Sequence, residues 1–358
     1  MGGPERVGGI ALTTVLVLGV GGNVSQGILK ALACASLPLR VLAGCIDPLS
    51  LGLYLADRSF VTPRADDPRF VSWLEGVCAE EGVHAVLSGS EPVLDALAVN
   101  AERVREATGA VCLVSPPDVL RVGADKLATA RWLAEQGLRS PRTADAADAR
   151  DVRELVAQCG FPLVAKPRKG KGAQGVATVT SEQELALVTG NPDLVVQEHL
   201  EGDEFKAGCL CDSAGEPTGI VTMRRDLREG TTFRAEVADF PEVRAYSEQI
   251  AKALGPAGPL NVQLRVVDGE PVAFECNVRF SGTTPLRTRL GFGEVEACLR
   301  HFVLGEPMPR CEARPGTVLR YWNEVYVPEV ARAELARTGG LREPESHDVS
   351  VEDWGMRR

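Results

Sequence analysis

The sequence lacks the features of a thiolate-metal, secreted or membrane-inserted protein. Its ten cysteines are scattered, and no C-x-x-C pair typical of zinc or redox sites occurs. The apolar run Val15–Val20 is too short to span a bilayer, and a glycine turn follows it in place of a cleavage site. We therefore expect free thiols in a reducing cytoplasm and no membrane partner.

An excess of positive charge is also missing. The formal net charge of −10 over 358 residues argues against an extended phosphate backbone as partner, so we expect no nucleic acid. A local basic pocket for a small anion is still compatible with this charge. The length favours two or three domains, and 44% hydrophobic with 25% charged residues is typical of a folded, soluble protein. No pattern distinguishes a monomer from a homo-oligomer.

The order of apolar segments predicts two kinds of architecture. Through residue 120, strands alternate with helices, as in "TVLVLGVGGNVSQGILKALA" followed by "LRVLAGCID", which favours a doubly wound parallel sheet. From "PLVAKPRKGKGAQGVATVTS" onward, strands are separated by glycine-rich turns, which favours an antiparallel α+β part. We expect strand structure in "RPGTVLRYWNEVYV" and a charged surface appendage in the last thirty residues.

A hairpin in residues 261–280 carries the most informative polar pattern. Its turn contains Asp268-Gly269, and antiparallel partners keep a constant index sum. Gln263 lies opposite Glu275 only if that sum is 538, which requires an odd loop such as Asp268-Gly269-Glu270. A two-residue loop would turn Gln263 to the other face. With the odd loop, we predict that Gln263, Glu275 and Asn277 converge.

The strand at residues 274–280 should separate polar from apolar side chains. Glu275, Asn277 and Arg279 would share one face, whereas Phe274, Cys276, Val278 and Phe280 would share the other. Few ligands, all of them oxygens, suit Mg²⁺ when phosphates complete its shell, and a guanidinium suits phosphate. A solvated sheet face is the alternative interpretation of this pattern.

Two other segments are suited to a nucleotide. Residues 165–176 deliver Lys166 into a loop rich in glycine and lysine, whose N–H groups can wrap a phosphate, although the loop lacks the G-K-[ST] ending of a P-loop. Residues 194–205 form an apolar strand followed by acids, which suits a hinge that pairs with an adenine edge.

The glycines of "GVGGNVSQG", residues 19–27, give a competing interpretation. A strand, glycines and a helix start can hold a dinucleotide, and Asp47 would mimic the ribose-binding acid. The spacing departs from G-x-G-x-x-G because Val24 holds the third glycine position. A nicotinamide oxidoreductase is therefore an alternative, not the favoured function.

Taken in order, "GADK" with Lys126, Lys166, "VVQEHLEGDEF", "NVQ" and "FECNVRFSGTT" resemble the ATP-grasp superfamily, especially its carbamoyl-phosphate-synthetase-like ligases. The resemblance covers roughly residues 10–307. It implies a pre-ATP-grasp α/β domain at 10–120 and an ATP-grasp domain at 121–307. A mobile lid subdomain would occupy about 143–197, and residues 308–358 would form the C-terminal strand and appendage.

The resemblance also implies roles for individual residues. The phosphates of ATP would contact Lys126 and Lys166, the adenine Gln197, Glu198 and the backbone at Leu200, and the ribose Glu204. One or two Mg²⁺ ions would bind Gln263, Glu275 and Asn277, while Arg279 and Lys166 would be catalytic. Two positions depart from the family pattern, because Val278 replaces the usual proline and Gln263 stands where glutamate is frequent.

The implied reaction joins a small-molecule carboxylate to an amine through an acyl phosphate, with release of ADP and phosphate. In such proteins the first glycine turn belongs to a domain that helps to bind the acceptor. Candidates for binding the substrate carboxylate are Arg224, Arg225, Arg234, Thr284, Arg287 and Arg289. A non-catalytic, ATP-binding regulatory protein with the same fold is the main alternative.

Overall fold

A computed structural model describes residues 6–7, 10–170, 174–343 and 347–351 of the chain. The chain divides into two compact units. The first comprises Met1–Pro117, Arg279–Cys311 and Arg320–Arg358, and the second comprises Asp118–Val278 and Glu312–Leu319. Residues 279–311 thus belong to the first unit, although the sequence assigns residues up to 307 to the ATP-grasp domain, and Glu312–Leu319 return to the second unit.

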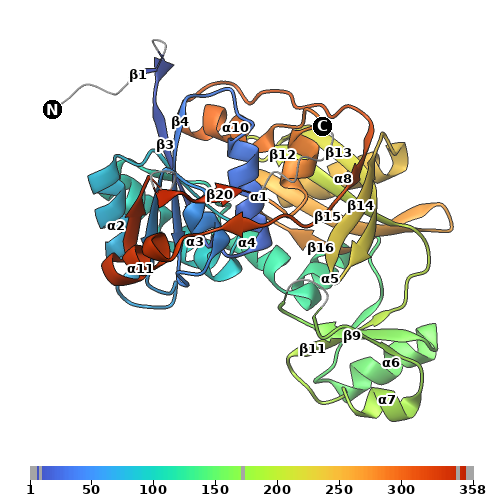
Figure 1. Ribbon diagram of the computed structural model, residues 1–358. Coiled ribbons are helices and arrows are strands. Elements are labelled where there is room, and N and C mark those ends of the chain that lie inside the picture. The colour runs from blue at the N-terminus through green and yellow to red at the C-terminus, as the bar shows by residue number, and fades with distance from the viewer. Residues whose placement is uncertain (1–5, 8–9, 171–173, 344–346, 352–358) are drawn as a thin grey trace. The chain divides into compact units, whose positions relative to one another are not determined.

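A twisted parallel sheet forms the core of the first unit (Figure 1). Its parallel strands follow the order β5-β4-β3-β6-β7. Within this sheet the chain starts at β3, adds β4 and β5 on one side, and then adds β6 and β7 on the other side. Helix α1 therefore covers one face, and α2 packs against α3 on the other. The bounds are β3 (Thr13–Leu18), β4 (Leu39–Cys45), β5 (Arg58–Val61), β6 (Ala85–Ser88), β7 (Val111–Cys112), α1 (Asn23–Leu32), α2 (Phe70–Glu81) and α3 (Glu91–Thr108). The predicted doubly wound fold is confirmed.

The C-terminal segment adds to this sheet. Strand β19 (Gly340–Arg342) pairs antiparallel with β5, and α11 (Glu329–Thr338) buries Ala331 and Leu335 completely. The expected surface appendage is therefore wrong for residues 329–342. The physical reason is that β5 would otherwise present an unpaired edge, and two apolar residues one helical turn apart give α11 a face to bury.

Helix α1 packs against a later part of the same unit. Gly27 lies within α1, and a Cβ there would come within 3.1 Å of Pro285 Cδ and 3.3 Å of Ser281 O. Pro285 belongs to α9 (Thr284–Thr288), which contacts α1, as does α10 (Glu294–Cys298). Close packing of α1 onto α9 therefore accounts for a glycine that had suggested a dinucleotide site.

The second unit contains a six-stranded antiparallel sheet in the order β16-β15-β12-β13-β14-β17. Helix α8 (Pro241–Leu254) packs against β12 and β13. The strands are β12 (Glu204–Cys211), β13 (Pro217–Arg228), β14 (Thr231–Val237), β15 (Gly258–Val267), β16 (Glu270–Asn277) and β17 (Gly316–Leu319). This sheet is the antiparallel part that the sequence predicts.

A smaller antiparallel sheet with two helices occupies the residues of the predicted lid (Figure 1). It comprises β8 (Thr143–Asp145), α6 (Ala149–Cys159), β9 (Leu163–Pro167), β10 (Ala177–Val179), α7 (Glu182–Ala186) and β11 (Leu194–Glu198). Its own apolar core includes Val152, Leu155 and Leu163. The predicted motion of this lid stays a prediction, and residues 171–173 of its glycine loop lie outside the described residues.

The remaining elements are short or connect the parts already named. They are β1 (Arg6–Val7), β2 (Ile10–Ala11), a 3₁₀ helix at Leu51–Tyr54, α4 (Pro117–Ala124), α5 (Lys126–Glu135), a π-helical turn at Leu299–Val303, β18 (Val325–Tyr326) and β20 (Ser350–Val351). Among the residues that the structure describes, no helix combines the length and the apolarity needed to cross a membrane.

Candidate active site

The β15–β16 hairpin brings the predicted ligands together, but its turn differs from the predicted one. Gln263 pairs with Glu275 and Asn261 with Asn277, as the index sum of 538 requires. The turn, however, has only two residues, since Val267 pairs with Glu270, and Asp268 and Gly269 have φ of 51° and 80°. Positive φ at both positions is the type I′ hairpin turn. The predicted pairing is confirmed, but the predicted odd loop is wrong.

A β-bulge supplies the extra residue instead. The register shifts between Gln263 and Leu264, and Phe274 is the unpaired residue on β16. Bulges change the direction of a side chain. The Phe274 ring lies 5.2 Å from Lys166 Nζ, a cation–π contact, so its predicted place on the apolar face with Cys276 is wrong.

Glu275 is the centre of the candidate metal site. Its Oε1 accepts hydrogen bonds from Gln263 Nε2 and from Asn277 Nδ2, both at 2.8 Å. Asn277 is 7% exposed, and Glu275 is the only acid of the three. A carboxylate beside two amides offers the ligand types that suit Mg²⁺, and both amides here turn their nitrogens to the carboxylate.

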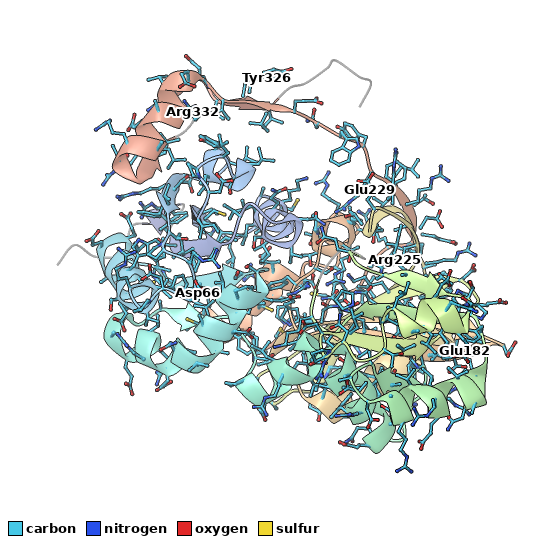
Figure 2. The ribbon with its side chains drawn as sticks, turned by 90° about the horizontal axis from the view of Figure 1, so that it is seen from below. Asp66, Glu182, Arg225, Glu229, Tyr326 and Arg332 are labelled. Atoms are coloured by element: carbon cyan, nitrogen blue, oxygen red, sulfur yellow. The ribbon has the colours of Figure 1, made fainter. Side chains whose placement is uncertain are left out.

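A buried arginine lies against this set. Arg225, on β13 and labelled in Figure 2, has a side chain only 5% exposed. Its Nη2 lies 2.5 Å from Gln263 Oε1 and 2.7 Å from Glu204 Oε1, and its Nη1 donates to Thr232 Oγ1. Arg265 Nη2 binds the other oxygen of Glu204 at 3.1 Å. The predicted ribose ligand Glu204 and the substrate candidate Arg225 therefore belong to one network with Gln263.

Two lysines approach the same place. Lys166, near the end of β9, is 7% exposed. Burial lowers the pKa of Lys166 to about 8; the negative charges of Glu275 and Glu204 oppose this shift, and the positive charge of Lys126 adds to it. A buried ammonium whose pKa is depressed by burial and by a second cation would gain from a bound anion.

The start of α5 explains why Lys126 lies near Lys166. Asp125 caps this helix by accepting from the N–H groups of Leu127 and Ala128. The same carboxylate pairs with Arg168 Nη2 at 2.8 Å, and Lys126 N donates to Arg168 O. Arg168 follows Lys166 by two residues, so this cap fastens the helix start to the end of β9.

The predicted adenine-binding residues lie at and just after the end of β11. Gln197 is 3% exposed, and its Nε2 donates to Thr143 Oγ1 on β8 at 2.7 Å. Glu198 Oε2 accepts from Arg142 N at 3.1 Å, and Leu200 is half-buried in the segment that leads to β12. Their contacts with a nucleotide stay predictions.

Sequence reasoning missed Lys206. This lysine is 6% exposed and lies in β12, where it pairs with Gln263 on one side and with Met223 on the other. Paired residues share a face of an antiparallel sheet, so Lys206 lies on the face of Gln263. The alternation in "EFKAGCLC" places Lys206 on the face of Glu204, but only the register shows that this face is the polar one.

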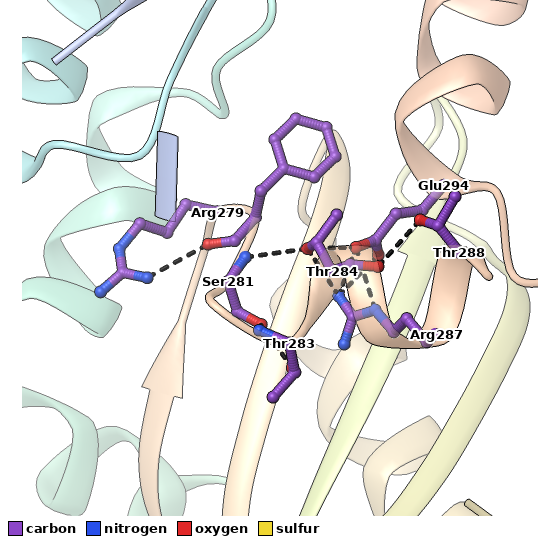
Figure 3. A network of polar contacts seen from close by, with 8 residues as sticks. Arg279, Ser281, Thr283, Thr284, Arg287, Thr288 and Glu294 are labelled. Atoms are coloured by element: carbon purple, nitrogen blue, oxygen red, sulfur yellow. Dashed lines mark hydrogen bonds and ion pairs between the residues drawn. The ribbon is translucent and has the colours of Figure 1, made fainter. Parts of the chain in front are cut away.

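The remaining substrate candidates fall into two groups. Arg224, Arg234 and Arg289 are exposed, and their role stays a prediction. Thr284 and Arg287 are fully buried. Figure 3 shows that both bind Glu294, with Thr284 Oγ1 at 2.5 Å and Arg287 Nη2 at 2.5 and 2.7 Å from its two oxygens. The prediction that Thr284 or Arg287 binds substrate is therefore corrected, because their polar atoms are committed to a sealed ion pair.

Arg279 belongs to the first unit. Its Nη2 lies 3.0 Å from Glu91 Oε1 at the start of α3, and its Nη1 donates to Phe280 O. The guanidinium follows Asn277 by two residues in the chain. Its catalytic role stays a prediction from the sequence.

Two family models match separate parts of the chain. Residues 190–325 match the model described as "ATP-grasp in the biosynthetic pathway with Ter operon", and residues 15–112 match the PylC-like N-terminal domain. The chain therefore contains an ATP-grasp domain, as the ordered motifs predict, and a PylC-like N-terminal domain. Its relatives include carbamoyl phosphate synthase large chains, which are ATP-grasp ligases.

One such relative, from Deinococcus deserti, is 29% identical over 224 residues, which are 57% of this chain and 21% of the relative. The chain thus spans about a fifth of the length of this curated relative. Among solved structures, N5-carboxyaminoimidazole synthetase from Staphylococcus aureus complexed with ADP has a TM-score of 0.70 at 15% identity, covering 91% of this chain and 85% of that one. An L-amino acid ligase from Bacillus licheniformis has a TM-score of 0.61 at 17% identity, covering 81% and 73%. These two structures share the fold.

Proposed function

We propose that the protein is an ATP-dependent ligase that joins a small-molecule carboxylate to an amine through an acyl phosphate. The observation that carries this proposal is the gathering of Glu275, Gln263 and Asn277 on a sheet face next to the buried Lys166. Oxygen ligands for Mg²⁺ and buried ammonium groups together suit a nucleotide triphosphate. The ATP-grasp relatives support the same class of reaction.

The proposed chemistry is two substitutions in sequence. A carboxylate oxygen of the substrate attacks the γ-phosphorus, the bond from that phosphorus to the β–γ bridging oxygen breaks, and ADP leaves. The amine nitrogen then attacks the acyl carbon, inorganic phosphate leaves, and the nitrogen loses a proton. Phosphoryl transfer of this kind needs mainly positioning and charge neutralisation from the protein.

The predicted site residues take the following parts. Lys166 and Lys126 neutralise phosphate oxygens, and Glu275 with Asn277 holds Mg²⁺, which shields phosphate charge when it is bound. The base and ribose lie along Gln197, Glu198, Leu200 and Glu204. Gln263, the third predicted metal ligand, donates to Glu275 Oε1. Arg279 steadies the transferring phosphoryl group, and the exposed Arg224, Arg234 and Arg289 are the remaining candidates for the substrate carboxylate.

The setting that we propose is the cytoplasm, where ATP is abundant. All ten cysteines lie outside any disulfide, and eight of them are buried: Cys45, Cys78, Cys112, Cys209, Cys211, Cys276, Cys298 and Cys311. Thiols of this kind persist in a reducing compartment.

The test is an ADP-release screen over pairs of carboxylic acids and amines, repeated with hydroxylamine in place of the amine. We expect one class of carboxylate to give ADP, and hydroxylamine to trap the acyl phosphate as a hydroxamate. Glu275→Gln is the matched control and should give neither product. ATP binding without ADP release for any pair would instead favour the non-catalytic regulatory protein.

A further inference from the structure

The orientation of the Gln263 amide is fixed by two charged neighbours. A guanidinium has only donors and a carboxylate has only acceptors. Arg225 Nη2 therefore faces the Gln263 oxygen at 2.5 Å, and Glu275 Oε1 faces the Gln263 nitrogen at 2.8 Å. Rotating the amide by 180° would place its N–H groups against the guanidinium and its oxygen against the carboxylate. Gln263 thus directs its only oxygen at a cation.

Arg225 is itself held in place. It binds Glu204 Oε1 through two nitrogens, at 2.7 and 3.1 Å, and donates to Thr232 Oγ1 at 3.1 Å. Its side chain is only 5% exposed. Moving it away from Gln263 would break these bonds inside a buried region and remove one of the two arginine partners of Glu204.

A divalent ion bound to the Gln263 oxygen would meet strong repulsion. A positive charge at hydrogen-bond distance from the same oxygen opposes a metal ion there, and partial burial weakens the screening. Lys206, paired with Gln263 across the sheet and 6% exposed, adds a second buried cation on this side. Glu275 and Asn277 lie on β16, on the other side of Gln263 from β12.

We propose that the Arg225 guanidinium takes the place of a second metal ion, so that the chain binds a single divalent cation through Glu275 and Asn277. Gln263 then acts as a positioning residue that links the fixed cation to the metal-binding carboxylate. This inference rests on the proposed function, because it concerns the metal that accompanies the nucleotide. Gln263, at a position where glutamate is frequent, suits this arrangement because a neutral amide can accept a hydrogen bond from the guanidinium and donate one to the carboxylate.

The experiment counts Mn²⁺ ions on the full chain by electron paramagnetic resonance with a non-hydrolysable ATP analogue at saturation. We expect one Mn²⁺ per chain and the spectrum of an isolated ion. Two ions held about 4 Å apart, as in two-metal sites, would give an exchange-coupled spectrum and a stoichiometry of two. That result would overturn the inference.

Two variants separate the metal ligand from the positioning residue. Glu275→Gln should weaken Mn²⁺ binding by about tenfold or more, and Gln263→Met, similar in length but without an amide, should weaken it clearly less, because both proposed metal ligands remain. Equal losses in the two variants would show that Gln263 is a metal ligand. Thermal unfolding of both variants checks that each is folded, and Asn277→Leu provides a second removal of a ligand if Glu275→Gln fails to fold.

The outcomes also separate this inference from the proposed function. Two coupled Mn²⁺ ions on a chain that binds the ATP analogue would overturn the single-ion inference and leave the ligase proposal intact. Failure of the wild-type chain to bind the analogue at all would overturn both.

Discussion

Each unit of the molecule contains a network of charged side chains, and the two networks differ in the charged groups that they bring together. In the first unit, Arg287 and Glu294 are both 0% exposed, and the single acid accepts from its arginine and from Thr284. Charges and hydrogen bonds balance there without any other molecule. Such a sealed pair holds the chain in place.

The network of the second unit is different in composition. Glu275 and Glu204 lie among Lys166, Arg225, Arg265 and the buried Lys206, and the amides of Gln263 and Asn277 both donate to Glu275. Burial holds the pKa of Lys166 well below its usual value. Several cations near oxygen ligands suit a phosphate and its metal ion. The comparison teaches that burial alone does not indicate a binding site, whereas the kinds of charged group gathered in one place do.

The largest expected effect comes from breaking the second network at its metal ligand. Glu275→Gln removes the only formal charge among the three predicted ligands, so we expect turnover to fall by about 100-fold or more with the fold intact. Steady-state ADP release at saturating Mg²⁺ measures it. A variant that keeps more than about a tenth of the wild-type rate shows that the metal assignment is wrong.

Breaking the first network should lower the stability of the fold. Glu294→Gln leaves the Arg287 guanidinium buried without its counter-charge, which should lower the free energy of unfolding by about 3–5 kcal/mol. Urea denaturation measures this loss, and the double variant Arg287→Met with Glu294→Met is the control, because it removes both charges. A Glu294→Gln protein of wild-type stability would contradict the structural role of this pair.

A pH profile gives a smaller and more specific effect. Because Lys166 has a lowered pKa of about 8, it loses its proton as the pH rises above that value, and its charge is then absent from the phosphate site. The kcat/KM for ATP reports ionisations of the free enzyme, so it should fall above pH 8. In Lys166→Arg the guanidinium stays charged, and the alkaline fall should move to higher pH. An unchanged profile in that variant would assign the fall to another group.

The sequence predicts the fold and the pairing at the site, but not the means by which the pairing arises. Polar alternation indicated that Gln263 faces Glu275, and that is correct. The turn chemistry of Asp268-Gly269 selects a two-residue loop, and the bulge at Phe274 restores the register. An alternation pattern alone does not reveal a bulge, since the inserted residue is an ordinary aromatic one.

The other contacts of the site could not be predicted because the partner residues lie outside the local sequence pattern. Arg225 and Lys206 become part of the site only through the order β15-β12-β13, which the sequence does not state. Thr284 and Arg287 looked like substrate ligands because they follow the polar strand, but Glu294, ten and seven residues further on, takes up their polar atoms. Likewise, nothing local in "GLR" indicates that residues 340–342 pair with β5.

The smallest effect concerns the predicted lid. Its loop must open to admit ATP and close to exclude water, so amides within residues 166–170 and 174–176 should gain hydrogen-exchange protection when ATP and Mg²⁺ are added. The sheet around β12 and β13 serves as the internal reference and should change little. Equal protection of the loop with and without nucleotide would argue against a closing lid.

The central claim is that the chemistry occurs at the γ-phosphate of ATP. Chromatography of the nucleotide after turnover tests it most directly, with inorganic phosphate and pyrophosphate measured in the same samples. Lys166, Glu275 and Asn277 are proposed to neutralise the phosphates during γ-phosphoryl transfer, so the account predicts ADP and inorganic phosphate in equal amounts. Stoichiometric AMP and pyrophosphate would mean attack at the α-phosphate and would contradict the proposed mechanism.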